Sequence, residues 1–431
     1  MLTTLVILFL LGYALITVEH SIRINKTATA LITGVLCWTV YSLTLSDPEP
    51  ALEALGHHLA EIAQILFFLL GAMTIVELID IHGGFTIITD RVATRNPRVL
   101  LWLIGGLTFI LSALLDNLAS ALVMVSVTRN LVRQAEQRKL IAGMIIIAAN
   151  AGGAWSPIGD VTTTMLWIGG QVTTVNIMSQ LFLPSLVCLL VPLLYLSFTL
   201  KSESPDRESK GHKYTSRPYI DPTARRDRRV MFAAGLSAIV MVPIFKSITH
   251  LPPYMAMLLA LGFVWVVSEL IHADKDEQER QRFSVAHALS KIDVPSILFF
   301  LGILLAVGSL ESVGILEQVA TSLNESVGNL DVIVGIIGVA SAIVDNVPIV
   351  AAAMGMYDLG AYPADHKLWE FLAYCAGTGG SLLVIGSAAG VAVMGMERLE
   401  FGWYLRRISG PALLGYLGGA LTYLAVYAVS H

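Results

Sequence analysis

The chain has 431 residues, of which 55% are hydrophobic and 14% are charged, and its formal net charge is −5. Soluble domains carry about 25% charged residues. A mean hydropathy of +0.72 therefore excludes an ordinary soluble protein and indicates a membrane protein with many spans. Cys37, Cys188 and Cys375 all fall in predicted spans, so we expect no disulfide framework.

Apolar runs of about 17–22 residues recur along nearly the whole chain, as a hydrocarbon core about 30 Å thick requires of a helix. Hydropathy and turn residues predict ten crossings, near 2–18, 27–45, 58–80, 140–168, 179–199, 230–247, 253–271, 293–311, 368–396 and 406–428. The first run lacks the basic start and cleavage site of a signal peptide, so we expect it to be retained.

The stretches 98–132 and 330–357 differ from the others, because each is apolar, too long for one helix and broken in its middle by Asp-Asn. Each is either two spans or a re-entrant hairpin with Asp-Asn at its tip. The arms on either side have about 11–18 residues, and this shortness favours the hairpin.

The basic residues predict an orientation. They leave only Lys246 and Lys367, of 27 Lys and Arg, on one side of the membrane, and the positive-inside rule makes the other side cytoplasmic, with both termini outside. Two spans in place of each hairpin would preserve this parity, so charge supports the orientation more than the hairpins. The polar, basic segment 200–229 is then a cytoplasmic linker, with a lipid-binding or regulatory role as the alternative.

An internal repeat connects the two halves. The string Ile-Leu-Phe-Phe at 65–68 returns at 297–300, the Asp-Asn strings follow at an offset of 229 residues, and the Gly-Gly pair at 152–153 matches that at 379–380. We expect a first repeat at 1–199 and a second at 230–431. Each has five crossings, an odd number, so the second is inverted in the membrane. The predicted fold class is an all-α polytopic membrane protein with two inverted-topology repeats, a pattern typical of secondary transporters.

Two strings carry the candidate chemistry: Ser112-Ala113-Leu114-Leu115-Asp116-Asn117 and Ser341-Ala342-Ile343-Val344-Asp345-Asn346. An Asp at the membrane centre costs roughly 2.5–3.5 kcal/mol on insertion scales, so a chain that carries one twice at equivalent positions is expected to use it. No Lys or Arg lies in the predicted core of any span, so we expect no internal ion pair. Capping of the following helical arm is the competing role for each Asp.

Two broken helices, 140–168 and 368–396, are expected to meet these tips. Glycine and proline permit unwound backbone there, which at membrane depth needs cover by protein or water. The oxygen-only side chains suit a hard cation such as Na+. The candidate cation- and proton-binding residues are Asp116, Asn117, Asn150, Asp160, Asp345 and Asn346, and Na+ is expected at the three Asp side chains.

Hydroxyl side chains around the breaks are candidate supporting residues, although Ser and Thr also commonly bond the carbonyls of their own helix. Asp160 is matched by a Ser in the second half, which makes it the candidate for discriminating cation from proton. The supporting set is Ser112, Ser156, Thr162, Thr163, Ser341, Thr378, Ser381 and Ser387.

Motifs of other functions are missing from the sequence. It has no GxxxxGK[ST], HExxH or GxSxG pattern. We therefore expect no ATP coupling, no enzyme activity, no cofactor and no nucleic-acid partner.

The paired Ser-Ala-x-x-Asp-Asn strings, the run Asn-Ala-Gly-Gly-Ala-Trp-Ser-Pro-Ile-Gly-Asp at 150–160 and the run Gly-Thr-Gly-Gly-Ser at 377–381 resemble NhaD-type Na+/H+ antiporters of the ion transporter superfamily. The match spans roughly 60–400. The resemblance implies a homodimer in a bacterial inner membrane that exports Na+ or Li+ in exchange for H+. The family's acidic and amide site residues carry over to the six candidates named above. Carboxylate symporters of that superfamily typically carry Ser-Asn-Thr at both tips, so Asp-Asn favours a cation.

The resulting hypothesis is competition of Na+ and H+ for shared carboxylates, with alternating access to the two sides. The first alternative is a Na+-coupled symporter of a carboxylate or oxyanion on the same fold, against which the lack of a buried Lys or Arg argues. The second is a channel in which the carboxylates form a selectivity ring.

Overall fold

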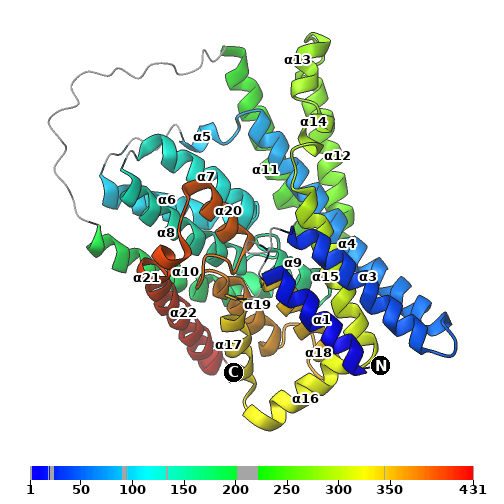
Figure 1. The fold of residues 1–431 in the computed structure, drawn as a ribbon. Helices are drawn as coiled ribbons and strands as arrows, with labels where there is room; N and C mark the ends of the chain where they lie inside the picture. Colours follow the sequence, from blue (N-terminus) through cyan, green and yellow to red (C-terminus); the bar gives the residue numbers. More distant parts are fainter. Residues whose placement is uncertain are drawn as a thin grey trace.

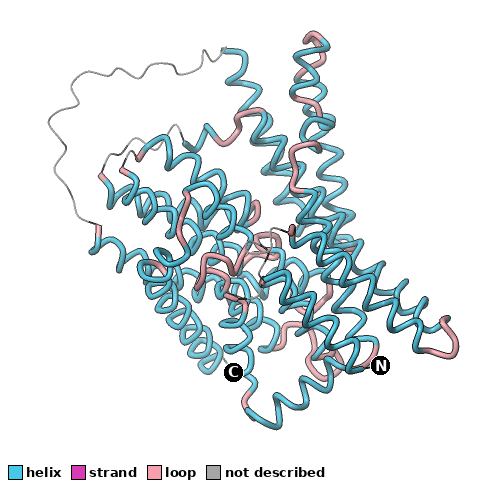
Figure 2. The backbone as a smooth tube through the Cα atoms, in the orientation of Figure 1, coloured by secondary structure: helices cyan, strands magenta, loops and turns pink. Residues whose placement is uncertain are grey.

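The computed structural model describes residues 2–17, 19, 24–89, 94, 96–132, 134–200, 222–343 and 345–430. Within these ranges the regular secondary structure is helical and no strand occurs (Figure 2). Among the described residues, eight helices are long and apolar enough to cross a membrane, or up to nine when a bent pair is counted as one span. The predicted class, an all-α polytopic membrane protein, is confirmed.

The helices of the first half, in chain order, are α1 (Leu2–Thr17), α3 (Lys26–Thr44), α4 (Glu49–Ile81), α5 (Thr86–Thr89), α6 (Pro97–Leu114), α7 (Asn117–Leu131), α8 (Ala135–Ala154), α9 (Val161–Ile168) and α10 (Thr174–Thr199). Those of the second half are α11 (Pro222–Thr249), α12 (Pro253–Ile271), α13 (Glu277–Arg282), α14 (Val285–Leu289), α15 (Val294–Ser312), α16 (Ile315–Val327), α17 (Leu330–Ala340), α18 (Asn346–Met356), α19 (Lys367–Gly379), α20 (Ala388–Glu397), α21 (Phe401–Arg407) and α22 (Ser409–Ser430).

The two predicted broken helices are interrupted where the glycines lie. Helix α8 ends at Ala154 and α9 begins at Val161, while α19 ends at Gly379 and α20 begins at Ala388. These interruptions place non-helical backbone inside the bundle, visible as the loops near the centre of Figure 2.

The two Asp-Asn stretches are each divided into two helices at the Asp-Asn pair. Helices α17 and α18 have 11 residues each, so each rises about 16 Å and neither can cross the membrane alone. Helix α6, with 18 residues, is long enough to cross by itself. The predicted hairpins, the count of ten crossings and the inverted relation of the halves stay predictions.

The helices form two groups (Figure 1). In one, which we call the α8 group, α6, α7, α10, α19 and α20 pack around α8, and α17 and α22 pack on α19. In the other, the α15 group, α3 and α4 pack on α15, α1 packs on α3, and α11 and α12 pack on α4. Helix α18 lies between them, because it contacts α15 as well as α9 and α19.

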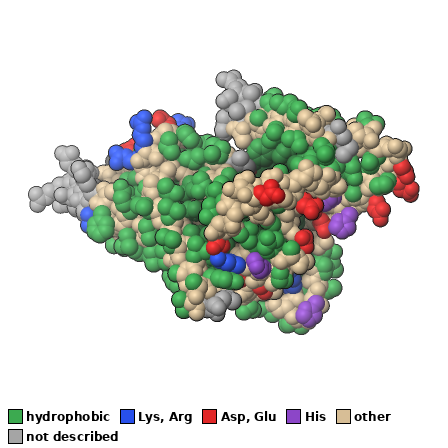
Figure 3. Space-filling model, turned by 90° about the horizontal axis from the view of Figure 1, so that it is seen from below, with side chains coloured by type: hydrophobic (Ala, Val, Ile, Leu, Met, Phe, Trp, Pro, Cys, Tyr) green, Lys and Arg blue, Asp and Glu red, His purple; other side chains and the backbone are tan. Residues whose placement is uncertain are grey.

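The surface agrees with a lipid environment. Leu10, Ile32, Phe198 and Leu259 are among many large hydrophobic side chains that are more than half exposed, and hydrophobic side chains cover much of the face in Figure 3. The three cysteines are buried and free, as predicted. The predicted linker, 200–229, falls for the most part on residues 201–221, which lie outside the described ranges.

Candidate cation site

The ends of the four interrupted segments share one local device: the side chain before each new helix accepts a hydrogen bond from its first turn. Asp116 accepts from the Ala119 N–H before α7, and Asp160 from the Thr162 N–H before α9. Asp345 does so for α18 and Ser387 for α20. The predicted capping role is therefore present at both Asp-Asn tips, because an oxygen side chain satisfies N–H groups that have no partner within the helix.

Asp160 lies at the centre of the polar network. Its carboxylate, 1% exposed, accepts from the Nδ2 of Asn117 at 2.6 Å, and the Nδ2 of Asn346 lies 3.5 Å from both of its oxygens. The N–H and hydroxyl of Thr162 each donate to Oδ1 at 2.8 Å. Both Asp-Asn tips thus reach one carboxylate from opposite halves of the chain.

Asn150 extends this network to the second broken helix. Its Oδ1 accepts from the Nδ2 of Asn117 at 3.2 Å, and its Nδ2 donates to the Ser387 hydroxyl at 3.0 Å. Asn117, Asn150, Asp160, Asn346 and Ser387 consequently form one connected set of buried polar groups. Buried networks of this kind fix side-chain positions when every member is satisfied.

Asp116 and Asp345 flank the network. The charges of both act on the Asp160 carboxylate, but the three Asp side chains do not bring their oxygens within 4.8 Å of one another. Among the described residues, only His57, His58 and Glu61 meet that criterion for a metal cluster. A cation held by Asp160 in this conformation would therefore take further ligands from the neighbouring amides, hydroxyls and carbonyls.

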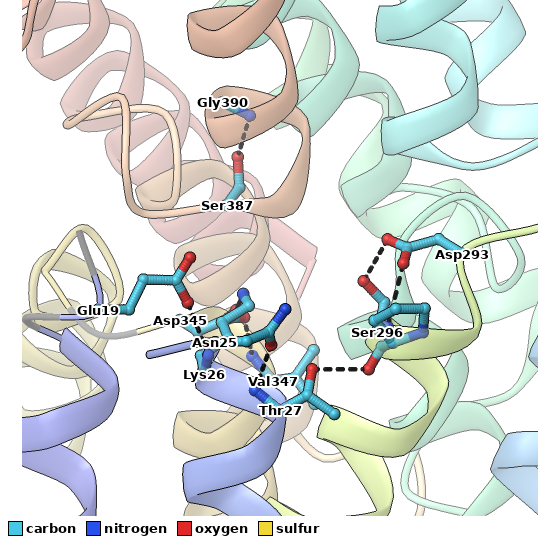
Figure 4. Close-up of polar contacts among 11 residues, drawn as sticks. Glu19, Asn25, Lys26, Thr27, Asp293, Ser296, Asp345, Val347, Ser387 and Gly390 are labelled. Carbon is cyan, nitrogen blue, oxygen red and sulfur yellow. Dashed lines mark hydrogen bonds and ion pairs between the residues drawn. The ribbon is translucent and has the colours of Figure 1, made fainter. Parts of the chain in front are cut away.

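The expectation that the candidate Asp residues form no internal ion pair is wrong. The Nζ of Lys26 lies 3.1 Å from Oδ2 of Asp345 (Figure 4). Lys26 is the first residue of α3 and was assigned to a cytoplasmic loop because it stands one position before the predicted span 27–45. A long side chain at a helix end can lay its aliphatic stem along apolar surface, and tertiary packing brings Asp345 to the Lys26 ammonium.

Several supporting hydroxyls bond backbone carbonyls. Ser112 donates to Ala149 at 2.5 Å, and Ser341 donates to Ala376 at 3.1 Å, which joins each tip to the helix before the break in its own half. The hydroxyls of Thr163, Thr378 and Ser381 likewise donate to the carbonyls of Gly153, Tyr374 and Thr378, in that order. The Ser156 hydroxyl instead accepts from the Ile158 N–H. Thr378 thus bonds a carbonyl of its own helix, α19, whereas Ser112 and Ser341 each connect two segments.

Glycines let the segments approach closely in the same manner in both halves. A Cβ on Gly152 would lie 2.3 Å from the Phe109 carbonyl oxygen, and one on Gly379 would lie 2.0 Å from that of Gly338. Phe109 and Gly338 are separated by 229 residues, the same offset as the Asp-Asn strings. The matching contacts agree with the predicted duplication.

Sequence reasoning also missed an ion-paired carboxylate. Glu397, at the end of α20, pairs with Arg129 at 2.8 Å and Arg138 at 2.5 Å, and its side chain is fully buried. These pairs join α20 to the ends of α7 and α8. No signal in the sequence distinguished these residues from solvated charges in loops.

Comparison with known proteins then decides the family. A family described as CitMHS, citrate transporter, matches residues 13–377. A protein of Arabidopsis thaliana named sodium/proton antiporter 1 is 52% identical over 98% of this chain and 72% of its own length. The chain belongs to the CitMHS family and, within it, to the NhaD-type antiporters.

The NhaD-type relatives include bacterial proteins. The Na(+)/H(+) antiporter NhaD of Vibrio cholerae is 31% identical over 97% of this chain and 90% of its own length. The sodium/proton antiporter 2 of Arabidopsis thaliana is 49% identical over 98% of this chain and 99% of its own length. An NhaD-type family member is a transporter, so the expectation that the chain is not an enzyme is confirmed.

Proposed function

We propose that this NhaD-type protein exchanges Na+ for H+ across a membrane by competition of the two ions for the carboxylates of Asp116, Asp160 and Asp345. The observation that carries the proposal is the position of Asp160, where amides from both Asp-Asn tips meet at one buried carboxylate. Within the described residues no Lys or Arg forms an ion pair with it. An anionic, oxygen-rich centre suits a hard cation or a proton. The names of the relatives support the same exchange.

The chemistry needs only a small rearrangement. Asn117 and Asn346 donate N–H groups to Asp160 in this structure. Rotation of either amide by half a turn presents its oxygen instead, so the same side chains can ligate Na+. Protonation of Asp160 would remove the charge that holds the cation, and this makes binding of the two ions mutually exclusive.

The arrangement in two groups supports a proposal for alternating access. We propose that the interrupted segments move with the α8 group against the α15 group, which would serve as the scaffold of a homodimer. We also propose Li+ as a second transported cation and no cofactor. The bacterial inner membrane, with both termini outside, stays a prediction, because the relatives come from a plant as well as from bacteria.

The test is proton movement in proteoliposomes with an internal pH dye, between pH 7 and 9.5, on addition of Na+, Li+ or K+. Na+ should dissipate a preset pH gradient, and Asp160→Asn should slow this at least 100-fold because it removes the central charge. Asp331→Asn is the control, since Asp331 pairs with Lys367 outside the network. Normal exchange by the Asp160 variant would contradict the proposal.

The second candidate function is Na+-coupled symport of a carboxylate. Two observations favour it: the family description names citrate, and Lys26 supplies a cation beside Asp345, which removes the earlier argument that no such group is present. Uptake of labelled citrate driven by a Na+ gradient, without proton movement on addition of any alkali cation, would establish this function instead.

A further inference from the structure

The contact between Lys26 and Asp345 joins the second Asp-Asn tip directly to α3. Asp345 is the N-cap of α18 at the second Asp-Asn tip, whereas Lys26 begins α3, which packs against α15 and α1. The two residues are 319 positions apart in the chain. Figure 4 shows the Lys26 side chain extending from α3 toward the Asp345 carboxylate.

Surrounding groups place the Lys26 ammonium. Asn25 caps α3 by accepting from the Thr27 N–H, and the Lys26 N–H donates to the Glu19 carboxylate at 3.0 Å. The Nζ lies 4.4 Å above the centre of the Phe299 ring, within reach of a cation–π contact. The ammonium is thus held over Asp345 by the backbone of α3 and by an aromatic ring of α15.

Only one of the two oxygens of Asp345 is used for capping. Oδ1 accepts from the Val347 N–H at 3.4 Å, and Oδ2 faces Lys26 at 3.1 Å. The matching tip lacks a counterpart, because within the described ranges Asp116 forms no ion pair. Of the three site carboxylates, the structure gives a resident monovalent cation to Asp345 alone.

We propose that Lys26 is a tethered counter-cation that occupies Asp345 in place of the transported cation and leaves when that cation binds. The proposal rests on the proposed function and deepens it, by naming what neutralises the second tip when no Na+ is held there. An ammonium and a Na+ compete for the same carboxylate oxygen, since each carries one positive charge.

The position of Lys26 adds a consequence for movement. Lys26 belongs to the α15 group, whereas Asp345 belongs to the second tip. Displacement of the second tip along the membrane normal must therefore separate Asp345 from Lys26. An empty tip is thereby held at α3 by the ion pair, and a loaded or protonated tip is free to move. Lys26 is accordingly a positioning residue that opposes movement of an empty carrier.

The chain offers a matched internal control. Lys367 pairs with Asp331 at 2.6 Å and lies 5.1 Å from the centre of the Tyr427 ring. Its side chain is 25% exposed, against 26% for Lys26. Both partners of this second pair belong to the α8 group, on α17 and α19, so neither cation binding at Asp345 nor movement between the groups should affect it.

The experiment measures how fast an amine-reactive reagent labels each lysine in the purified full chain, by peptide mass spectrometry at pH 8.5. NaCl is compared with choline chloride at equal ionic strength. We expect Na+ to raise labelling of Lys26 about fivefold or more and to leave labelling of Lys367 unchanged. Asp345→Asn should give fast labelling of Lys26 that no longer responds to Na+.

Two outcomes separate this inference from the proposed function. Labelling of Lys26 that is the same with and without Na+, in protein that exchanges Na+ for H+, overturns the role of Lys26 alone. If labelling of Lys26 responds to Na+ in protein that has no exchange activity, the result supports the role of Lys26 as counter-cation and overturns the proposed function. Equal responses of Lys26 and Lys367 would show a general effect of salt and also overturn the role of Lys26.

Discussion

The two Asp-Asn tips have the same sequence device but different surroundings. At the first, Asp116 caps α7 at 2.6 Å, and α7 packs within the α8 group. At the second, Asp345 caps α18 more loosely, at 3.4 Å, and pairs with Lys26 of the other group. Matching motifs therefore give both tips a capping Asp, while the backbone angles of that Asp and the neighbours of its carboxylate differ between the halves.

The two broken helices also differ, in this case in the side chain that caps the helix after the break. Asp160 and Ser387 both cap the helix that follows and both belong to the network around Asn150. Only Asp160 carries a charge, and both tip amides point to it. The two halves thus share the positions of their caps, while the first half alone has a carboxylate at the break of its interrupted helix.

The largest expected effect comes from neutralising the two tip carboxylates separately. Asp116→Asn and Asp345→Asn should each slow Na+-dependent proton movement at least 100-fold, because each removes a charge that acts on Asp160. Their effects on stability should differ. Asp345→Asn replaces the ion pair with Lys26 by a neutral acceptor, at a cost of about 1 kcal/mol, whereas Asp116→Asn removes no ion pair.

Thermal unfolding in detergent distinguishes these two variants. A melting temperature clearly lower for Asp345→Asn than for Asp116→Asn is the expected result. Equal melting temperatures would mean that the ion pair contributes nothing to the folded state, and wild-type exchange rates in either variant would remove that residue from the site.

Intermediate effects on stability are expected at Gly152 and Gly379, where the backbone of each broken helix approaches a neighbouring segment closely. Gly152→Ala and Gly379→Ala place a Cβ 2.3 Å and 2.0 Å from a backbone carbonyl oxygen, so a segment must shift. Overpacking of this kind typically costs about 1–3 kcal/mol. The controls are Gly106→Ala and Gly335→Ala, one in each half, where the added Cβ meets nothing within 4 Å.

The midpoint of unfolding of each variant, measured in a series of increasingly denaturing detergent mixtures, gives the change in stability for both halves. Loss of stability in the first two variants, with both controls near wild type, is expected. A tolerated Gly379→Ala would show that the second break is looser than the structure describes.

The smallest effect concerns a contact between the two halves at the ends of α4 and α12. The Nδ1 of His82 donates to the Leu78 carbonyl at 2.6 Å, so its Nε2 accepts from the Nε2 of His272 at 2.8 Å. His272 then keeps an unprotonated Nδ1, which has no hydrogen-bond partner among the described residues. Burial, and then the nearby Lys275, lowers the pKa of His272 to about 4.

A lowered pKa means that the folded state binds this proton at a lower pH than the unfolded state does. The stability contributed by neutral His272 is therefore complete above its ordinary pKa of 6.5 and is lost as the pH falls toward 4. At pH 5.5 the loss amounts to about 1 kcal/mol. His272→Gln should abolish this part of the pH dependence of the melting temperature, and His57→Gln, at an exposed position on α4, should not. An unchanged profile in His272→Gln would assign the acid sensitivity to other groups.

Much of the site could be predicted from sequence because membrane depth makes its signals strong. A carboxylate, an amide or a run of glycines is costly in hydrocarbon, so Asp116, Asp160 and Asp345 were recognisable without a structure. The grouping of Asn117, Asn150 and Asn346 around Asp160 agrees with that expectation. Lys26 was missed, because its position at the edge of a predicted span gives the same signal as a cytoplasmic loop residue.

The sequence by itself determined the class of the molecule, the places where its helices break and the oxygen side chains at those breaks. These properties depend on local hydropathy and on the backbone freedom of glycine, which act within a few residues. Only the tertiary structure decided that Asp160 is the common partner of both tips, that Lys26 neutralises Asp345 and that His82 meets His272. Such contacts join residues up to 319 positions apart, and packing between helices, which no local pattern specifies, brings them together.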